Sequence, residues 1–253
     1  MADPPARDDP VARLRAMTPA RVSLGLAGSG LPTRPMLDFQ LAHARARDAV
    51  HAGMPEGAFG AEIAGLPVIE VRSRAPDRAT YLRRPDLGRR LAPESEAALA
   101  ATGARCDVAI VIADGLSAAA MLAHGAAIAT AVLGRLAGWA PAPIVVAHQA
   151  RVAIGDEIGA ALGAKLAIVL IGERPGLSAA DGVGAYLTWA PRPGRLDSER
   201  NCVSNIRPGG FAIDRAAALI AALAQGARTL GETGVRLKIG APSAAMKVVS
   251  PPL

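Results

Sequence analysis

The sequence predicts an α/β protein, in which a domain built on a parallel sheet follows a small, mostly helical N-terminal region. Three short, continuous apolar runs carry this prediction, at residues 107–113, 143–147 and 165–171. Such runs are typical of strands that are buried on both faces of a sheet. Helical segments separate them, and this alternation favours a parallel sheet with helices on both faces. Hydrophobic residues make up 51% of the chain and aromatic residues 3%, so we expect an aliphatic core.

The first 105 residues show no comparable alternation. Helices are expected at residues 10–17, 33–51 and 94–102. Thr33 is a candidate N-cap for the second helix, which has a proline in its first turn. A short apolar stretch at 66–71 and an arginine-rich stretch at 72–90 lie between the second and third helices. We therefore assign residues 1–105 to an N-terminal helical region with a flexible leader, and residues 106–253 to the sheet domain.

The later part of the chain continues this pattern less regularly. Helices are expected from the end of the first strand to about residue 136, and again near 155–162. Residues 185–189 are interpreted as an edge strand, and 213–230 as a long amphipathic helix. The run 199–208 is dense in polar side chains without clear periodicity, so we interpret it as a loop suited to a polar ligand or a subunit contact.

Three loops are expected to meet at one edge of the sheet. They follow the three strands and comprise residues 114–117, 148–152 and 173–176. Ligands of open α/β sheets bind beyond the carboxyl ends of the strands, so these loops are the candidate site. Glu173 is notable because its carboxylate directly follows a buried strand. Two interpretations stay open for it, a ligand contact and an internal ion pair with Arg174.

The sequence contains no self-contained catalytic motif. It lacks the Gly-x-Ser-x-Gly of serine hydrolases, a Walker motif, a His-Glu-x-x-His helix and a Cys-x-x-Cys pair. A nicotinamide-dependent oxidoreductase is disfavoured, since Gly28-x-Gly30 lacks the third glycine of a dinucleotide fingerprint and the first strand ends in Asp114-Gly115-Leu116-Ser117. The absence of these motifs favours a binding subunit over a free-standing enzyme.

Isolated titratable residues give weaker signals. The four histidines are scattered over different elements: His43, His51, His124 and His148. We assign none of them as a metal ligand, including His148 at the end of a strand. The Asp156-Glu157 pair begins a helix and is interpreted as helix capping and dipole compensation.

Composition limits the compartment and the partners. Cys106 and Cys202 form no disulfide framework, which favours a reduced, intracellular protein. We expect no signal peptide in the start, MADPPARDDP, and no membrane span, because no apolar run reaches about 18 residues. The net charge of +6 leaves a nucleic-acid partner as an alternative, but the scarcity of aromatic stacking platforms weighs against it.

Five stretches of the sequence resemble the small (light) subunit of ethanolamine ammonia-lyase. They occur in the family's order, at residues 33–51, 112–118, 155–159, 170–177 and 199–208. Because each stretch is long, the set is specific. The resemblance implies a Rossmann-like domain in one chain of a two-chain enzyme, which converts ethanolamine to acetaldehyde and ammonia with adenosylcobalamin. It also implies that the cobalamin lies between this chain and a large, substrate-binding subunit, and that this chain alone is inactive.

The resemblance places the family's cobalamin contacts on Val152, Glu173 and Cys202. Glu173 would accept hydrogen bonds from the cofactor, whereas Val152 and Cys202 would offer packing contacts. Weaker candidates follow from loop position alone: Asp114, Gly115, Leu116 and Arg174.

The resemblance also implies how the cobalt is ligated and where the enzyme works. The sequence has no Asp-x-His-x-x-Gly motif, in agreement with base-on binding, in which the nucleotide tail of the cofactor keeps its own base on cobalt. A cytoplasmic location is expected, with a bacterial microcompartment as an alternative that the short, proline-rich leader makes less favoured.

Overall fold

A seven-stranded mixed sheet forms the centre of the molecule, in the strand order β1-β2-β4-β3-β5-β6-β7. The structure is a computed structural model that describes residues 10–18, 20–103 and 105–238. The strands are β1 (Glu62–Ile63), β2 (Leu66–Arg72), β3 (Val108–Ala113), β4 (Ile144–His148), β5 (Leu166–Gly172), β6 (Val183–Trp189) and β7 (Arg200–Ile206). Strands β2, β4, β3 and β5 are parallel, and the other three join the sheet antiparallel. The predicted α/β class with a parallel core is confirmed.

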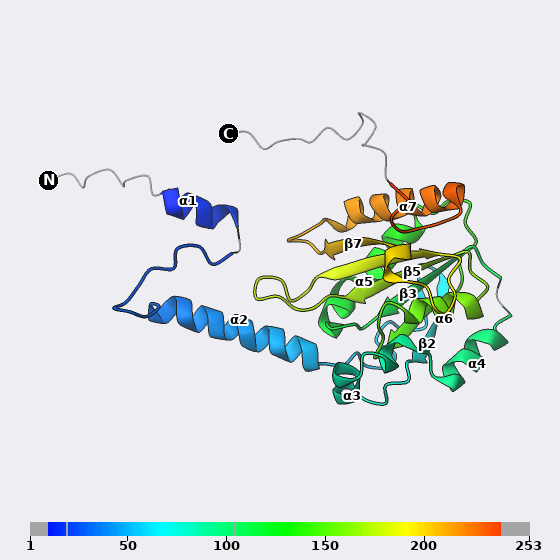
Figure 1. The fold of residues 1–253 in the computed structure, drawn as a ribbon, viewed down its shortest axis with the longest axis horizontal. Coiled ribbons are helices and arrows are strands. Elements are labelled where there is room, and N and C mark those ends of the chain that lie inside the picture. The colour runs from blue at the N-terminus through cyan, green and yellow to red at the C-terminus, as the bar shows by residue number, and fades with distance from the viewer. Residues whose placement is uncertain (1–9, 19, 104, 239–253) are drawn as a thin grey trace.

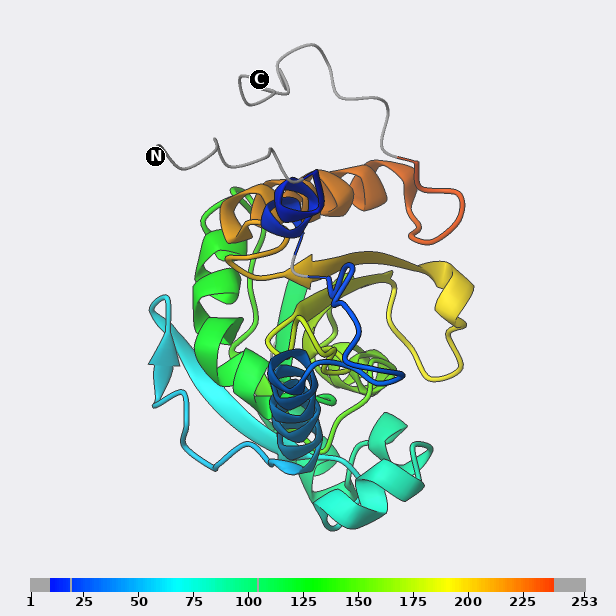
Figure 2. The ribbon, with the colours of Figure 1, turned by 90° about the vertical axis from the view of Figure 1, so that its left-hand side faces the viewer.

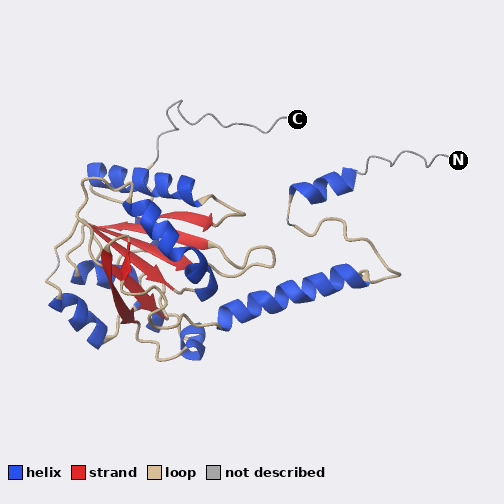
Figure 3. Ribbon diagram, turned by 180° about the vertical axis from the view of Figure 1, so that it is seen from behind, coloured by secondary structure: helices blue, strands red, loops and turns tan. Residues whose placement is uncertain are grey.

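Helices cover both faces of the sheet, as Figure 3 shows. Helices α5 (Ala118–Leu133) and α7 (Ile213–Leu230) pack on one face, and α4 (Pro93–Ala101) and α6 (Ile154–Ala161) on the other. Strand β3 serves both cores by alternation. Its Val108, Ile110 and Ile112 side chains join the α5–α7 core, whereas Ala109, Val111 and Ala113 join the α4–α6 core. A strand buried on both faces needs apolar residues at every position, which explains its continuous apolar run.

The two N-terminal helices lie apart from the sheet. They are α1 (Pro10–Met17) and α2 (Thr33–His51), as predicted, and α2 projects away from the body of the molecule (Figures 1 and 2). No residue of α2 is buried. The prediction that Thr33 caps α2 was wrong. Pro32 occupies the N-cap because its ψ of 148° lies outside the helical range, whereas Thr33 is already the first helical residue, and no side chain caps the helix.

Strand β2 enters the sheet from within the region expected to be mostly helical, so the sheet begins before residue 106. It pairs in parallel with β4, and it is followed by α3 (Arg78–Arg83) and the short 3-10 helix η1 (Leu87–Arg89). The short apolar stretch was not recognised as a strand because Pro67 and Glu70 interrupt it. The division of the chain into two domains at residue 105 stays a prediction.

Two further expectations about the sheet were wrong. The segment expected to form an edge strand is β6, an inner strand between β5 and β7. The polar run expected to form a loop is largely β7, which is itself the edge. Val203 and Ile206 on β7 are buried against the α7 side, while Cys202 and Ser204 are exposed on the opposite side. A register shift between β6 and β7 sets Val203 and Ile206 three positions apart, so the alternation is broken and the run looks aperiodic.

Candidate functional site

A cavity of about 520 Å³ opens beside the N-terminus of α6, on the face of β6 and β7 opposite α7. Its lining comes from four places in the chain: the α3–η1 segment, the loop before α6, the end of β5, and the β6–β7 hairpin. The lining residues are Leu82, Pro85, Arg89, Arg151, Val152, Ala153, Arg174, Tyr186, Asp197, Arg200 and Cys202. The volume falls in the range of small-molecule sites, roughly 300–1,000 Å³.

The cavity brings together three of the residues singled out from the sequence. Val152, Arg174 and Cys202 all line it, although they come from three different elements. Glu173 adjoins it through Arg174 but is not part of the lining. Asp114, Gly115 and Leu116 lie apart from the lining, behind the loop that carries Val152.

Glu173 is held at the meeting point of β5, β6 and β7. Both of its carboxylate oxygens accept from the backbone N–H of Asn205, at 3.1 and 3.2 Å. Two glycines make room for the carboxylate: a Cβ at Gly182 would lie 2.9 Å from one oxygen, and a Cβ at Gly184 would lie 3.1 Å from the other. The side chain is therefore fixed in direction. A carboxylate offers about four acceptor sites, so it keeps capacity for further donors.

Cys202 faces Tyr186 directly across the β6–β7 ladder. Although the residue is exposed, partial burial of the Cys202 thiol raises its pKa, and the nearby Glu173 charge raises it further, while a hydrogen bond with Tyr186 opposes both. Burial, with the neighbouring Cys202 and Glu173, raises the pKa of Tyr186 to about 12. Both groups thus stay protonated at neutral pH, so the thiol offers a packing surface rather than a nucleophile.

Asp114 organises the cavity loop from behind. Its fully buried carboxylate accepts from the backbone N–H groups of Gln149 and Ala150, both at 3.0 Å, and lies 3.3 Å from Arg78. Burial raises the pKa of Asp114, while these donors and Arg78 oppose the rise. Asp114 therefore shapes the loop that presents Val152, and it contacts no open space itself.

Gly115 and Leu116 close the β3–α5 turn against the end of β5. The N–H of Leu116 donates to Gly172 at 2.9 Å. Gly115 has a φ of +55°, and a Cβ there would lie 2.3 Å from the carbonyl oxygen of Gly172. Only glycine fits this contact, so these residues position the strand ends.

Tyr81 supports the same loop from α3. It is fully buried, and its hydroxyl donates to the carbonyl of Ala150 at 3.0 Å. The guanidinium groups of Arg78 and Arg151 lie over its ring, at 4.8 and 4.4 Å from the centroid. Arg78 also donates to the carbonyl of Val50 in the last turn of α2. This cluster links the projecting helix to the loop that lines the cavity.

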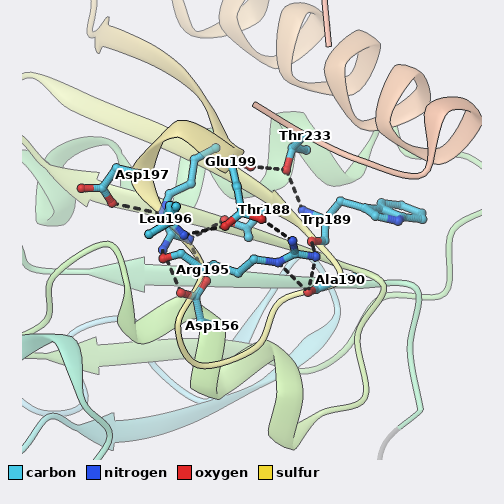
Figure 4. Close-up of polar contacts among 10 residues, drawn as sticks. Asp156, Thr188, Trp189, Ala190, Arg195, Leu196, Asp197, Glu199 and Thr233 are labelled. Carbon is cyan, nitrogen blue, oxygen red and sulfur yellow. Dashed lines mark hydrogen bonds and ion pairs between the residues drawn. The ribbon is translucent and has the colours of Figure 1, made fainter. Parts of the chain in front are cut away.

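A buried ion pair ties α6 to the β6–β7 hairpin. Arg200 donates to both carboxylate oxygens of Asp156, at 2.7 and 2.8 Å, and to the hydroxyl of Thr188 at 2.8 Å. Burial raises the pKa of Asp156, and Arg200 opposes that rise. Figure 4 shows the surrounding contacts, in which Arg195 donates to the carbonyl groups of Trp189, at the end of β6, and Ala190, which follows it. This network holds one wall of the cavity.

The Asp156-Glu157 pair therefore does more than compensate the helix dipole. Both acids lie in the first turn of α6, as expected, but neither caps it, because Ala153 is the N-cap. Glu157 instead accepts from the backbone N–H of Leu91 at 2.6 Å. Each acid anchors a different neighbouring segment to α6.

His148 is 3% exposed and lies 3.3 Å from Glu70 of β2, so it joins two strands of the sheet. Within the described residues, no group of three or more His, Cys, Asp or Glu side chains is arranged to hold a metal ion. In the same part of the chain, no helix is both long enough and apolar enough to cross a membrane.

Several lining residues were missed from the sequence. They are Leu82, Pro85, Arg89, Arg151, Ala153, Tyr186 and Asp197. Arg151 adjoins Val152 in a loop already singled out, so its position was an available signal. Tyr186 lies opposite Cys202, a relation that appears only once the hairpin register is known. Nothing in the sequence places α3 and η1 beside that loop.

The fold and the cavity place the chain in the class of α/β domains with a ligand-sized cavity at the sheet. Residues 8–238 match the family model of the ethanolamine ammonia-lyase light chain (EutC). The ethanolamine ammonia-lyase small subunit of Bradyrhizobium diazoefficiens is 55% identical over 244 residues, with 94% of each chain covered. That of Azotobacter vinelandii is 49% identical over 242 residues, covering 92% of this chain and 90% of the relative. The chain belongs to the family of ethanolamine ammonia-lyase small subunits, which is a family of carbon–nitrogen lyase subunits.

Proposed function

We propose that this chain is the cobalamin-binding small subunit of an adenosylcobalamin-dependent ethanolamine ammonia-lyase, which converts ethanolamine to acetaldehyde and ammonia. The observation that carries the proposal is the cavity, which unites Val152 and Cys202 beside Glu173 on an open sheet face. When bound, adenosylcobalamin supplies the radical chemistry of the reaction. The residues of this chain bind and orient the cofactor.

The cavity fits one part of the cofactor rather than the whole. At about 520 Å³ it is smaller than a cobalamin molecule, so the rest of the cofactor would lie outside this chain. This supports a location between the small subunit and a large subunit, the partner that the family name implies. The substrate would then be bound by the large subunit, and this chain alone would be inactive.

The residues present suit the groups of a cobalamin. Val152 and Cys202 offer uncharged packing surface, because the Cys202 thiol stays protonated. Glu173 has a fixed carboxylate with remaining acceptor capacity, which matches the amide donors on the rim of a corrin ring. We assign no protein ligand to cobalt and expect base-on binding. The proposed location is the cytoplasm, or a microcompartment within it.

The test fills the cavity in the co-purified complex of small and large subunits. Val152→Trp places a large ring in the lining, so we expect loss of cobalamin binding in equilibrium dialysis and loss of acetaldehyde release. Val235→Trp is the matched control, since Val235 is 76% exposed and lies outside the lining. If Val152→Trp binds cobalamin as tightly as the unchanged complex, the cavity is not the cofactor site.

A further inference from the structure

The cavity carries an excess of positive charge. Four arginines line it, whereas Asp197 is the one carboxylate in the lining. Arg200 is already neutralised by its bidentate pair with Asp156, and Asp197 lies 3.4 Å from Arg200 as well. The remaining arginines are Arg89, Arg151 and Arg174.

None of these three guanidinium groups forms an ion pair within the described part of the chain. Arg89 and Arg174 are exposed in the lining and enter none of the ion pairs of that part. Arg151 lies over the Tyr81 ring, and its Nε is buried without a hydrogen-bond partner. Guanidinium groups gathered at one concave surface repel each other and attract an anion. The cavity is therefore built for a ligand with an anionic group.

The local packing brings two of these arginines to one wall. The backbone N–H of Arg151 donates to the carbonyl of Gly88 at 2.7 Å. A Cβ at Gly88 would lie 2.9 Å from the Tyr81 ring and 3.0 Å from Arg151, so the glycine lets η1 approach the loop closely. Arg89 follows directly and thus stands beside Arg151. Arg174 enters the lining from the end of β5, next to the Tyr186 and Cys202 surface.

We infer that Arg89, Arg151 and Arg174 form a phosphate subsite that binds the phosphodiester of the cobalamin nucleotide tail. This inference rests on the proposed function. The amide side chains of a corrin ring are uncharged, whereas the phosphodiester is the anionic group on the periphery of the cofactor. Arginine is suited to phosphate because its planar fork donates two parallel hydrogen bonds. Val152 and Cys202, which line the same cavity, are left for uncharged parts of the cofactor.

The test compares cobalamin with cobinamide, which has the corrin ring but lacks the nucleotide tail and its phosphodiester. Dissociation constants for both are measured by spectrophotometric titration of the small–large subunit complex. The variants are Arg89→Gln, Arg174→Gln and the double variant. Arg83→Gln is the matched control, since this exposed arginine lies next to Leu82 but outside the lining. Thermal unfolding of each variant shows that it folds, as expected for exposed positions.

Each single variant should weaken cobalamin binding about tenfold, the loss of one charge-assisted contact. Cobinamide binding should not change, and the control should bind both as before. Raising the salt concentration should weaken binding of cobalamin but not of cobinamide. Equal weakening for the two corrinoids, or unchanged cobalamin binding, would overturn the subsite.

Inorganic phosphate separates the cofactor's phosphodiester from free phosphate as the ligand. We expect phosphate to compete with cobalamin and not with cobinamide. If phosphate binds the arginines while leaving cobalamin binding unchanged, the site holds free phosphate and the inference fails. The Val152→Trp result distinguishes the two proposals: loss of binding there, with arginine variants that bind both corrinoids normally, rejects the subsite and keeps the cofactor site.

Discussion

At the scale of single residues, the environment of Cys202 controls its reactivity. Burial and the Glu173 charge raise the pKa of the thiol, so the thiolate forms at a higher pH than in an ordinary cysteine. We expect iodoacetamide to modify the cofactor-free complex slowly at pH 7–8, with the rate rising only above the usual thiol range of about 8.5. Mass spectrometry of the Cys202 peptide against pH measures this.

The matched variant for this prediction is Glu173→Gln, which removes a negative charge near the thiol. It should shift the pH profile of Cys202 modification to lower pH, because the pKa of the thiol falls when that charge is lost. Cys202→Ser should abolish the signal, since Cys106 is the other cysteine and is buried. A profile identical to that of a free cysteine would contradict the described environment.

At the scale of elements, the approach of the β3–α5 turn to β5 depends on Gly115. Gly115→Ala combines a positive φ with a Cβ 2.3 Å from the Gly172 carbonyl oxygen. We expect a loss of at least about 2 kcal/mol in the free energy of unfolding, measured by urea denaturation. Gly138→Ala isolates the backbone effect, because Gly138 has a φ of +76° with nothing within 4 Å of its Cβ position. It should cost about 1 kcal/mol. Equal losses would show that the close contact does not matter.

Arg78 on α3 contacts the last turn of α2 and the β3–α5 turn, so its loss should change the stability of all three segments. Arg78→Ala removes the partner of the fully buried Asp114, which should cost about 3–5 kcal/mol of stability. Hydrogen exchange should also become faster in the last turn of α2 and in the 149–151 loop, because Arg78 contacts Val50 and supports Asp114. Arg47→Ala on the exposed face of α2 is the control and should change stability by less than about 0.5 kcal/mol. Unaltered exchange in α2 would rule out the connection.

At the scale of the whole molecule, α2 is a helix without a core. It has no buried residue and exposes Met36, Leu37, Phe39 and Leu41. A chain that begins at residue 53 should therefore unfold in urea with the m-value of the full chain, within about 15%, because little buried surface is lost. A clear fall in the m-value would show that α2 is part of the cooperative fold. In the full chain these exposed apolar side chains are typical of a surface that a partner protein covers, which agrees with the proposed large subunit.

The parts of the fold that could be predicted are those in which one physical demand dominates. Strands β3, β4 and β5 are buried on both faces, so they appear as continuous apolar runs, and α7 shows its amphipathic period throughout residues 213–230. Strand β2 could not be predicted from the sequence because the charged residue Glu70 interrupts its apolar run. In the structure the Glu70 carboxylate contacts His148 and accepts from the backbone N–H of Gly57. Edge strand β7 looked like a loop because its exposed side chains are polar and a register shift against β6 breaks its alternation.

Some residues of the candidate site could likewise be predicted from the sequence, and others could not. Val152, Arg174 and Cys202 were singled out from strand ends and the family resemblance, and they share the cavity lining. Asp114 was placed correctly at a strand end, but strand ends hold residues that shape loops as well as residues that face ligands. Arg89 could not be predicted, because its place depends on Gly88 packing against a loop more than sixty residues later. Whether the lining residues bind the cofactor stays a prediction.

The pairing of β5, β6 and β7 has a consequence for the order in which the molecule assembles. These strands are neighbours in sequence and pair as two hairpins, whereas β2 must find β4 across the whole of α3, α4, β3 and α5. Local pairings close early because they lose less chain entropy, and distant ones close late. We therefore expect the hairpin wall of the cavity to form first. When the full chain refolds from denaturant, strand β2 would dock last and bring the Arg78 anchor of α2 with it. The hairpin wall of the cavity would therefore form before the α3–η1 wall and before the projecting helix is anchored.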